Sequence, residues 1–178
     1  REFRNALGNF ATGVTIITAK GPKGDLVGVT ANSFNSVSLD PPLVLWSIDK
    51  SSLSLQILED SSHFCVHILR EDQGEQCMAF AKSGTDKFGA VEYSEGLGGA
   101  PLLEGCLARF ECKSVVHHEG GDHMIIVGEV ERYDTNEGEP LTFFRGPLGK
   151  LAEPASNPPH DGPPPARSNN TPTRYVRP

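Results

Sequence analysis

The chain has 178 residues and carries 23 acidic against 16 basic side chains, a formal net charge of −7. This length fits one domain, and an acidic chain without a Lys/Arg cluster argues against a nucleic-acid-binding surface. No apolar run reaches the roughly 18 residues of a membrane span, no signal peptide is evident, and four cysteines without a CxxC pair indicate free thiols. We therefore expect a cytoplasmic protein.

The predicted elements are mostly strands. Alternating or β-branched runs predict strands over residues 14–18, 26–31, 43–48, 63–68, 108–116, 123–132 and 141–144. Apolar residues at helical spacing predict short helices over residues 2–10 and 73–82. A third helix, capped by Ser51 or Ser52, is expected to include Leu53, Ile57 and Leu58. Residues 93–103 contain three glycines and a proline and are expected to form a loop.

Six or seven strands in hairpin order, with two or three short helices, predict a mainly β protein folded as a closed antiparallel barrel. No GxGxxG segment or strand–helix alternation indicates a Rossmann domain. Residues 1–153 form this predicted domain. Residues 154–178 hold eight of the 14 prolines and few large apolar side chains, which predicts a flexible tail unless it docks on a partner subunit.

Small and hydroxyl-bearing residues fill positions 28–38, where an ordinary strand pair would carry bulky side chains. A backbone without bulk can approach a flat ligand closely, and its amide and hydroxyl groups can bond the ligand's polar edge. After Pro41 and Pro42 the apolar run 43–46 returns the chain to a core. This pattern predicts a groove for a planar cofactor. The alternative is a polar turn of a β-barrel.

Four blocks of sequence, residues 3–15, 28–44, 121–130 and 141–146, occur in this order and spacing in one family. With them the chain resembles the short-chain flavin reductases, the reductase components of two-component flavin-dependent monooxygenases, which have the FMN-binding split-barrel fold. The resemblance extends over residues 1–150. It departs at Pro147 and Leu148, where family members often have an aromatic residue, and in the proline-rich tail.

The resemblance implies an antiparallel split β-barrel and an NAD(P)H-dependent flavin reductase that passes hydride from NADH or NADPH to FAD or FMN. It also implies a homodimer and a separate oxygenase component that uses the reduced flavin. The implied flavin-binding residues are Thr30, Ala31, Asn32 and Ser33 at the ring, Ser36, Val37 and Ser38 near the ribityl chain or ring edge, Ser47, Lys50, Ser51 and Ser52 at the phosphate, and Ala81, Lys82 and Phe88 at the outer phosphate or adenine.

The resemblance also implies a site formed by Gly121, Asp122 and His123. His123 is the candidate catalytic residue, with the role of positioning the nicotinamide carboxamide for direct hydride transfer. A lone histidine at the start of a strand is otherwise a hydrogen-bonded structural residue. His117 and His118 lie nearby, but no Cys or Asp spacing completes a metal site, and none is expected.

Two other functions remain open. One is a flavin-binding storage or sensor protein without turnover. The other is an oxidase resembling the pyridoxamine-phosphate enzymes, which the lack of Arg/Lys pairs for a second phosphate disfavours. The sequence does not distinguish FAD from FMN, and it favours NADH over NADPH only weakly.

Overall fold

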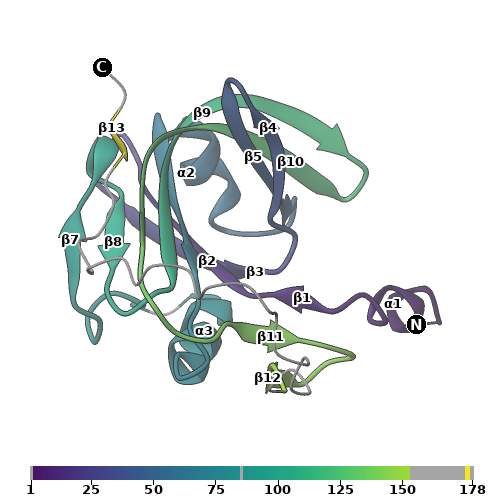
Figure 1. Ribbon diagram of the computed structural model, residues 1–178. Coiled ribbons are helices and arrows are strands. Elements are labelled where there is room, and N and C mark those ends of the chain that lie inside the picture. The colour runs from purple at the N-terminus through teal and green to yellow at the C-terminus, as the bar shows by residue number, and fades with distance from the viewer. Residues whose placement is uncertain (1, 85, 153–174, 177–178) are drawn as a thin grey trace.

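Antiparallel β-structure makes up most of the computed structural model, which describes residues 2–84, 86–152 and 175–176 (Figure 1). In chain order the elements are α1 (Glu2–Leu7), β1 (Thr12–Gly13), β2 (Thr15–Lys20), β3 (Leu26–Ala31), β4 (Asn35–Leu39), β5 (Pro42–Asp49), α2 (Leu55–Asp60), β6 (His63–Ile68), α3 (Gly74–Ala81), β7 (Tyr93–Glu95), the 3-10 helix η1 (Leu97–Gly99), β8 (Pro101–Leu103), β9 (Ala108–Gly120), β10 (His123–Thr135), β11 (Leu141–Phe143), β12 (Leu148–Lys150) and β13 (Tyr175–Val176).

The main sheet has the strand order β3-β2-β6-β9-β10-β5-β4, and β13 pairs with β10 beyond the end of β5. The sheet curls so that its two ends approach each other, but β3 and β5 share no ladder of backbone hydrogen bonds. The prediction of a closed barrel is therefore wrong in this respect, because the barrel is split between β3 and β5. The mainly antiparallel split barrel implied by the family resemblance is confirmed.

Strand β2 separates two apolar cores, which is why five successive residues of it are buried. On one side Ile17 joins the core inside the curled sheet, with Trp46 and Phe64. On the other side Ile16 joins a second core under α3, together with Phe80. A strand covered on both faces favours a continuous apolar and β-branched run, and this is the pattern that predicted it from the sequence.

The smaller elements lie around this sheet. Strands β1, β11 and β12 form a separate three-stranded sheet beside α3, and α1 extends away from the body at one end of it (Figure 1). Strands β7 and β8 form a two-stranded ribbon where residues 93–103 were expected to be a loop, so that prediction is wrong. No helix in the described part of the chain combines the length and the hydropathy needed to span a membrane.

Element ends also differ from the sequence-based prediction. Strands β9 and β10 continue to Gly120 and Thr135 because they pair with each other along almost their whole length. Strand β4, which was not predicted, pairs with β5 through a register shift at Val37. Of the predicted tail, residues 154–174 and 177–178 lie outside the described residues.

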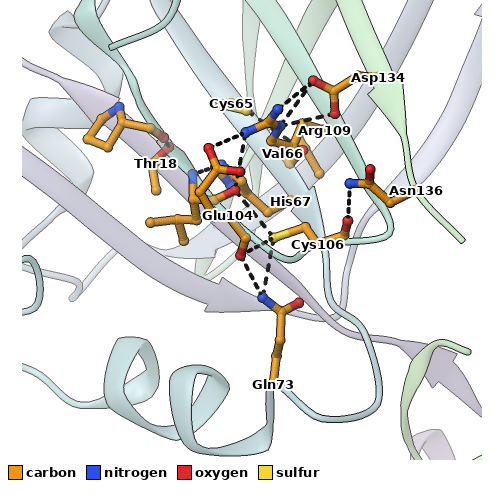
Figure 2. A network of polar contacts seen from close by, with 12 residues as sticks. Thr18, Cys65, Val66, His67, Gln73, Glu104, Cys106, Arg109, Asp134 and Asn136 are labelled. Atoms are coloured by element: carbon orange, nitrogen blue, oxygen red, sulfur yellow. Dashed lines mark hydrogen bonds and ion pairs between the residues drawn. The ribbon is translucent and has the colours of Figure 1, made fainter. Parts of the chain in front are cut away.

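A buried polar network holds β2 against the rest of the sheet (Figure 2). The fully buried His67 on β6 bridges two strands: its Nδ1 donates to the carbonyl of Ile16 at 3.0 Å, and its Nε2 accepts from the backbone N–H of Leu103 at 3.0 Å. Beside it the Arg109 guanidinium forms an ion pair with Asp134 at 2.7 Å. The His67 bond to Ile16 ties β6 to β2, the strand that pairs with β3.

Candidate functional site

A cleft of about 700 Å³ lies at the split of the barrel, between β3 and the second half of β5. Its ends are formed by the turn that precedes α2 and by the α3–β7 loop. The lining residues are 26–33, 46–49, 52–54, 57, 80–84, 86–88 and 123. This volume lies in the usual range for small-molecule and cofactor sites.

The cleft exists because two strands end their pairing there. Strand β3 is the last strand of the main sheet, and β4 pairs with β5 only as far as Leu45. The Ser33 hydroxyl spans the gap at one end, where its Oγ accepts from the backbone N–H of Ser47 at 2.9 Å and donates to the Ser47 carbonyl at 3.1 Å. The rest of β5 pairs with β10 along one edge only, and its other edge faces the cleft.

The residues predicted at the ring all line this cleft: Thr30, Ala31, Asn32 and Ser33. The Thr30 hydroxyl donates to the carbonyl of Cys77 at 2.7 Å and so ties β3 to α3. This hydroxyl is already used within the protein, so the polar surface toward a ligand is the main chain of these residues together with the exposed Asn32 side chain. The small-residue signal in the sequence thus marked a segment that lines the cleft, and its contact with the ring stays a prediction.

Gly28 shows a second reason for the small residues. A Cβ at this position would lie 2.4 Å from Cε1 of Phe80 and 3.2 Å from Cζ of Phe88. Phe80 is buried, and its ring meets the Phe88 ring edge-on with centroids 5.3 Å apart. The glycine is therefore required by packing against α3, whereas the sequence analysis attributed it to the ligand alone.

The turn at residues 49–52 differs from the prediction. Helix α2 begins at Leu55 with Ser54 at its N-cap position, so neither Ser51 nor Ser52 caps it. The Ser51 backbone N–H and hydroxyl instead both donate to Asp49 Oδ1 at 2.7 Å, and these bonds lower the pKa of the Asp49 carboxyl. The serines stop short of the helix because this local turn competes with helical hydrogen bonding.

The predicted phosphate ligands are only partly brought together. Ser47 and Ser52 line the cleft, whereas Lys50 and Ser51 do not. The Lys50 ammonium forms an ion pair with Glu119 on β9. Its charge is thus committed to a neighbouring strand, a contact that the spacing in the sequence could not reveal.

The other predicted residues fall into two groups. Ala81, Lys82 and Phe88 line the cleft from α3 and the loop after it. Ser36, Val37 and Ser38 lie on β4, outside the cleft lining. Their proposed contact with the ribityl chain stays a prediction.

His123 lines the cleft at the first residue of β10, opposite Asp49 on β5. Its Nδ1 lies 2.8 Å from Oδ1 of Asp122, which fixes the imidazole while leaving it partly exposed to the cleft. Gly121, with a positive φ of 73°, and Asp122 form the tight β9–β10 turn and do not line the cleft. They therefore position His123.

The sequence analysis missed several lining residues, above all Trp46 and Lys87. Trp46 is buried, and within the described part of the chain its indole Nε1–H has no hydrogen-bond partner. The Lys87 ammonium donates to the carbonyls of Gly28 and Phe80, each at 2.8 Å. In the sequence, the one signal that Lys87 lies at the site is that it directly precedes Phe88, which was predicted to bind the ligand. Among the residues described, no three His, Cys, Asp or Glu side chains gather to hold a metal ion.

Comparison with known proteins identifies the family. The flavin reductase like domain matches residues 7–152, which is most of the chain. The chain belongs to the flavin reductase family. It is 47% identical over 152 residues to the FMN reductase (NADH) SmoA of Agrobacterium fabrum, covering 85% of this chain and 86% of that protein. It is 42% identical to HsaB of Rhodococcus jostii, a reductase subunit of a flavin-dependent monooxygenase, covering 82% and 75% of the two chains.

Solved flavin reductases share the fold. The nitrilotriacetate monooxygenase component B homologue of Mycobacterium thermoresistibile superposes with a TM-score of 0.83, at 37% identity and 90% coverage of each chain. The NADH:FAD oxidoreductase SgcE6 of Streptomyces globisporus, solved with NAD and FAD fragments, gives 0.82 at 38% identity and covers 87% of this chain and 94% of that one. The family resemblance read from the sequence is thereby confirmed.

The residues of the cleft fit a flavin. Strand β3 and the second half of β5 line two sides of the cleft, and main-chain groups along these edges can bond the polar edge of a planar ring. Lys82 and Lys87 place two ammonium groups in the lining at the end near α3.

Proposed function

We propose that this flavin reductase oxidises NADH, transfers the hydride to FAD or FMN, and releases reduced flavin to a separate flavin-dependent oxygenase. The observation that carries this proposal is the cleft at the barrel split, where residues 30–33, Ser47, Ser52, Phe88 and His123 meet in a chain of this family. Relatives named as an NADH-dependent FMN reductase and as reductase subunits of monooxygenases support both the donor and the delivery role.

A bound flavin supplies the redox chemistry by accepting a hydride from the nicotinamide. The protein contributes geometry: the main chain of residues 30–33 orients the ring, Ser52 bonds the ligand at the end near α2, and Lys82 and Lys87 attract a phosphate at the end near α3. His123, held by Asp122, then faces the nicotinamide and orients its carboxamide. Precise placement of two rings in contact is the main source of rate enhancement for such a transfer.

The identity of the flavin is left as either FMN or FAD. One relative is named an FMN reductase and a structural neighbour an NADH:FAD oxidoreductase, and both names specify NADH. We therefore assign NADH as the preferred donor. An enzyme that consumes NADH works where that nucleotide is maintained, so we assign it to the cytoplasm.

We also propose a homodimer. Large apolar side chains are exposed on residues 2–10, which we call the N-terminal arm, and on β4. Phe3 has 76%, Phe10 77% and Leu39 94% of its full exposure. A groove of about 1270 Å³ lies between the arm and the body, lined by Leu7, Phe10 and Phe34 among others, and it shares Asn32 and Ser33 with the cleft. Exposed apolar surface of this extent favours burial by a second copy.

The test is anaerobic stopped-flow mixing of the purified protein and flavin with NADH, followed at the visible absorbance band of the oxidised flavin. We expect the band to bleach in a reaction that depends on the protein. A storage or sensor protein would bind flavin without bleaching. If flavin binds and the band persists with both NADH and NADPH, the reductase proposal is wrong.

A further inference from the structure

Lys87 is the charged residue of the described cleft lining whose side chain is fixed by hydrogen bonds to two backbone carbonyls. Its Nζ donates to two backbone carbonyls, Gly28 on β3 and Phe80 on α3, and the side chain is partly buried. An ammonium has three N–H groups, so these two bonds leave one donor. Burial also lowers the pKa of this ammonium.

The charge of Lys87 is not neutralised by a neighbour. Within the described residues none of the ion pairs includes it. Both carboxylates of the cleft have local donors instead: Asp49 accepts from Ser51, and Asp86 accepts from the backbone N–H groups of Phe88 and Gly89 at 3.1 Å each. A fixed cation with a remaining donor thus lines the cleft.

We propose that Lys87 binds a phosphate oxygen of the nucleotide that occupies the cleft, while it holds the α3–β7 loop against β3. The inference rests on the proposed function, because it takes the ligand to be a flavin or nicotinamide nucleotide. Lys82, the other lysine of the lining, is an exposed residue at the C-terminal end of α3. Lys87 is fixed by its two carbonyl bonds, so it loses less side-chain entropy when the phosphate arrives.

The two roles separate in an experiment that compares ligands with and without a phosphate. NADH oxidation is measured with FMN and with riboflavin as acceptor, for wild type, Lys87→Met and the control Lys23→Met, an exposed lysine in the β2–β3 turn. Loss of one charge-assisted hydrogen bond should raise the KM for FMN in Lys87→Met about tenfold more than the KM for riboflavin, which changes only through loss of the two carbonyl bonds. A rise in the KM for NADH alone would instead assign the phosphate to the nicotinamide nucleotide.

A purely structural role predicts another result. If Lys87 only holds the loop, Lys87→Met impairs FMN and riboflavin equally, and this outcome, or no change with any ligand, overturns the proposal. Lys87→Gln keeps one donor for the carbonyls and removes the charge, so it replaces the methionine variant if that protein does not fold. Should the wild type oxidise NADH with neither acceptor, the reductase proposal fails, and equilibrium dialysis of FMN and riboflavin must still show a Lys87-dependent preference for FMN.

Discussion

Stability should fall steeply in mild acid because of one buried residue, His67. Its environment requires the neutral ring with the proton on Nδ1, since Nδ1 faces the carbonyl of Ile16 and Nε2 accepts from the backbone N–H of Leu103 (Figure 2). A second proton would convert that acceptor into a donor facing a donor. Burial lowers the pKa of His67 from 6.5 to about 4, with a smaller contribution from the nearby Arg109.

The size of the effect follows from proton linkage. The unfolded chain takes up a proton on this residue as the pH falls below 6.5, whereas folded His67 stays neutral until about pH 4. The unfolded state therefore binds more protons in this window, and stability decreases as the pH falls. Each pKa unit corresponds to about 1.4 kcal/mol, so the loss between pH 6.5 and pH 4 is about 3 kcal/mol.

The assay is urea unfolding at several pH values from 7.5 to about 4, followed by fluorescence of Trp46, the single tryptophan, which is fully buried. His67→Gln is the test variant because an amide can donate to Ile16 and accept from Leu103 but does not titrate. We expect the stability advantage of wild type over His67→Gln to shrink by about 3 kcal/mol from pH 7 to pH 4. The exposed His118→Gln is the control and should follow wild type. Parallel curves for wild type and His67→Gln would refute this account.

Two further predictions concern the site and the arm. His123→Ala should raise the KM for NADH several-fold more than the KM for flavin, because we propose that the imidazole orients the nicotinamide. Steady-state kinetics of this variant and of the control His118→Ala measure the effect, and equal effects on both substrates would contradict the proposed role. Phe10→Asp, on the exposed arm, should shift the protein from dimer to monomer in sedimentation velocity; an unchanged dimer, or a monomeric wild type, would contradict the proposed interface.

The strands of the central sheet could be predicted because their burial is visible in the local sequence pattern of apolar and β-branched residues. The run from Thr15 to Ala19 is buried on both faces, and its unbroken apolar and β-branched character is visible in the sequence. Strand β4 was not predicted because it is short and largely exposed and lies within the block of small and hydroxyl-bearing residues that was interpreted as a ligand groove. Its pairing with β5 comes from the hairpin and belongs to tertiary structure.

In the candidate site, too, some residues could be predicted from the local sequence and others depend on tertiary contacts. The small residues from Thr30 to Ser33 form one continuous segment, so sequence reasoning could find them. Lys50 and Lys87 could not be distinguished by type or by spacing: the first is paired with Glu119 on another strand, and the second is held by carbonyls of β3 and α3. Contacts between segments decide which lysine is available to a phosphate.

The way the cleft is built favours a ligand that exchanges. Its deepest aromatic residues are committed to the protein, since Trp46 packs edge-on against Phe64 and Phe80 packs against Phe88, and both Trp46 and Phe80 are buried. The rest of the lining combines strand edges with hydroxyl, amide, charged and aliphatic side chains. We expect such a surface to orient a ring mainly through hydrogen bonds, so that binding is specific in geometry and modest in affinity. A reductase that supplies reduced flavin to another protein requires this combination, because its product must leave after each turnover.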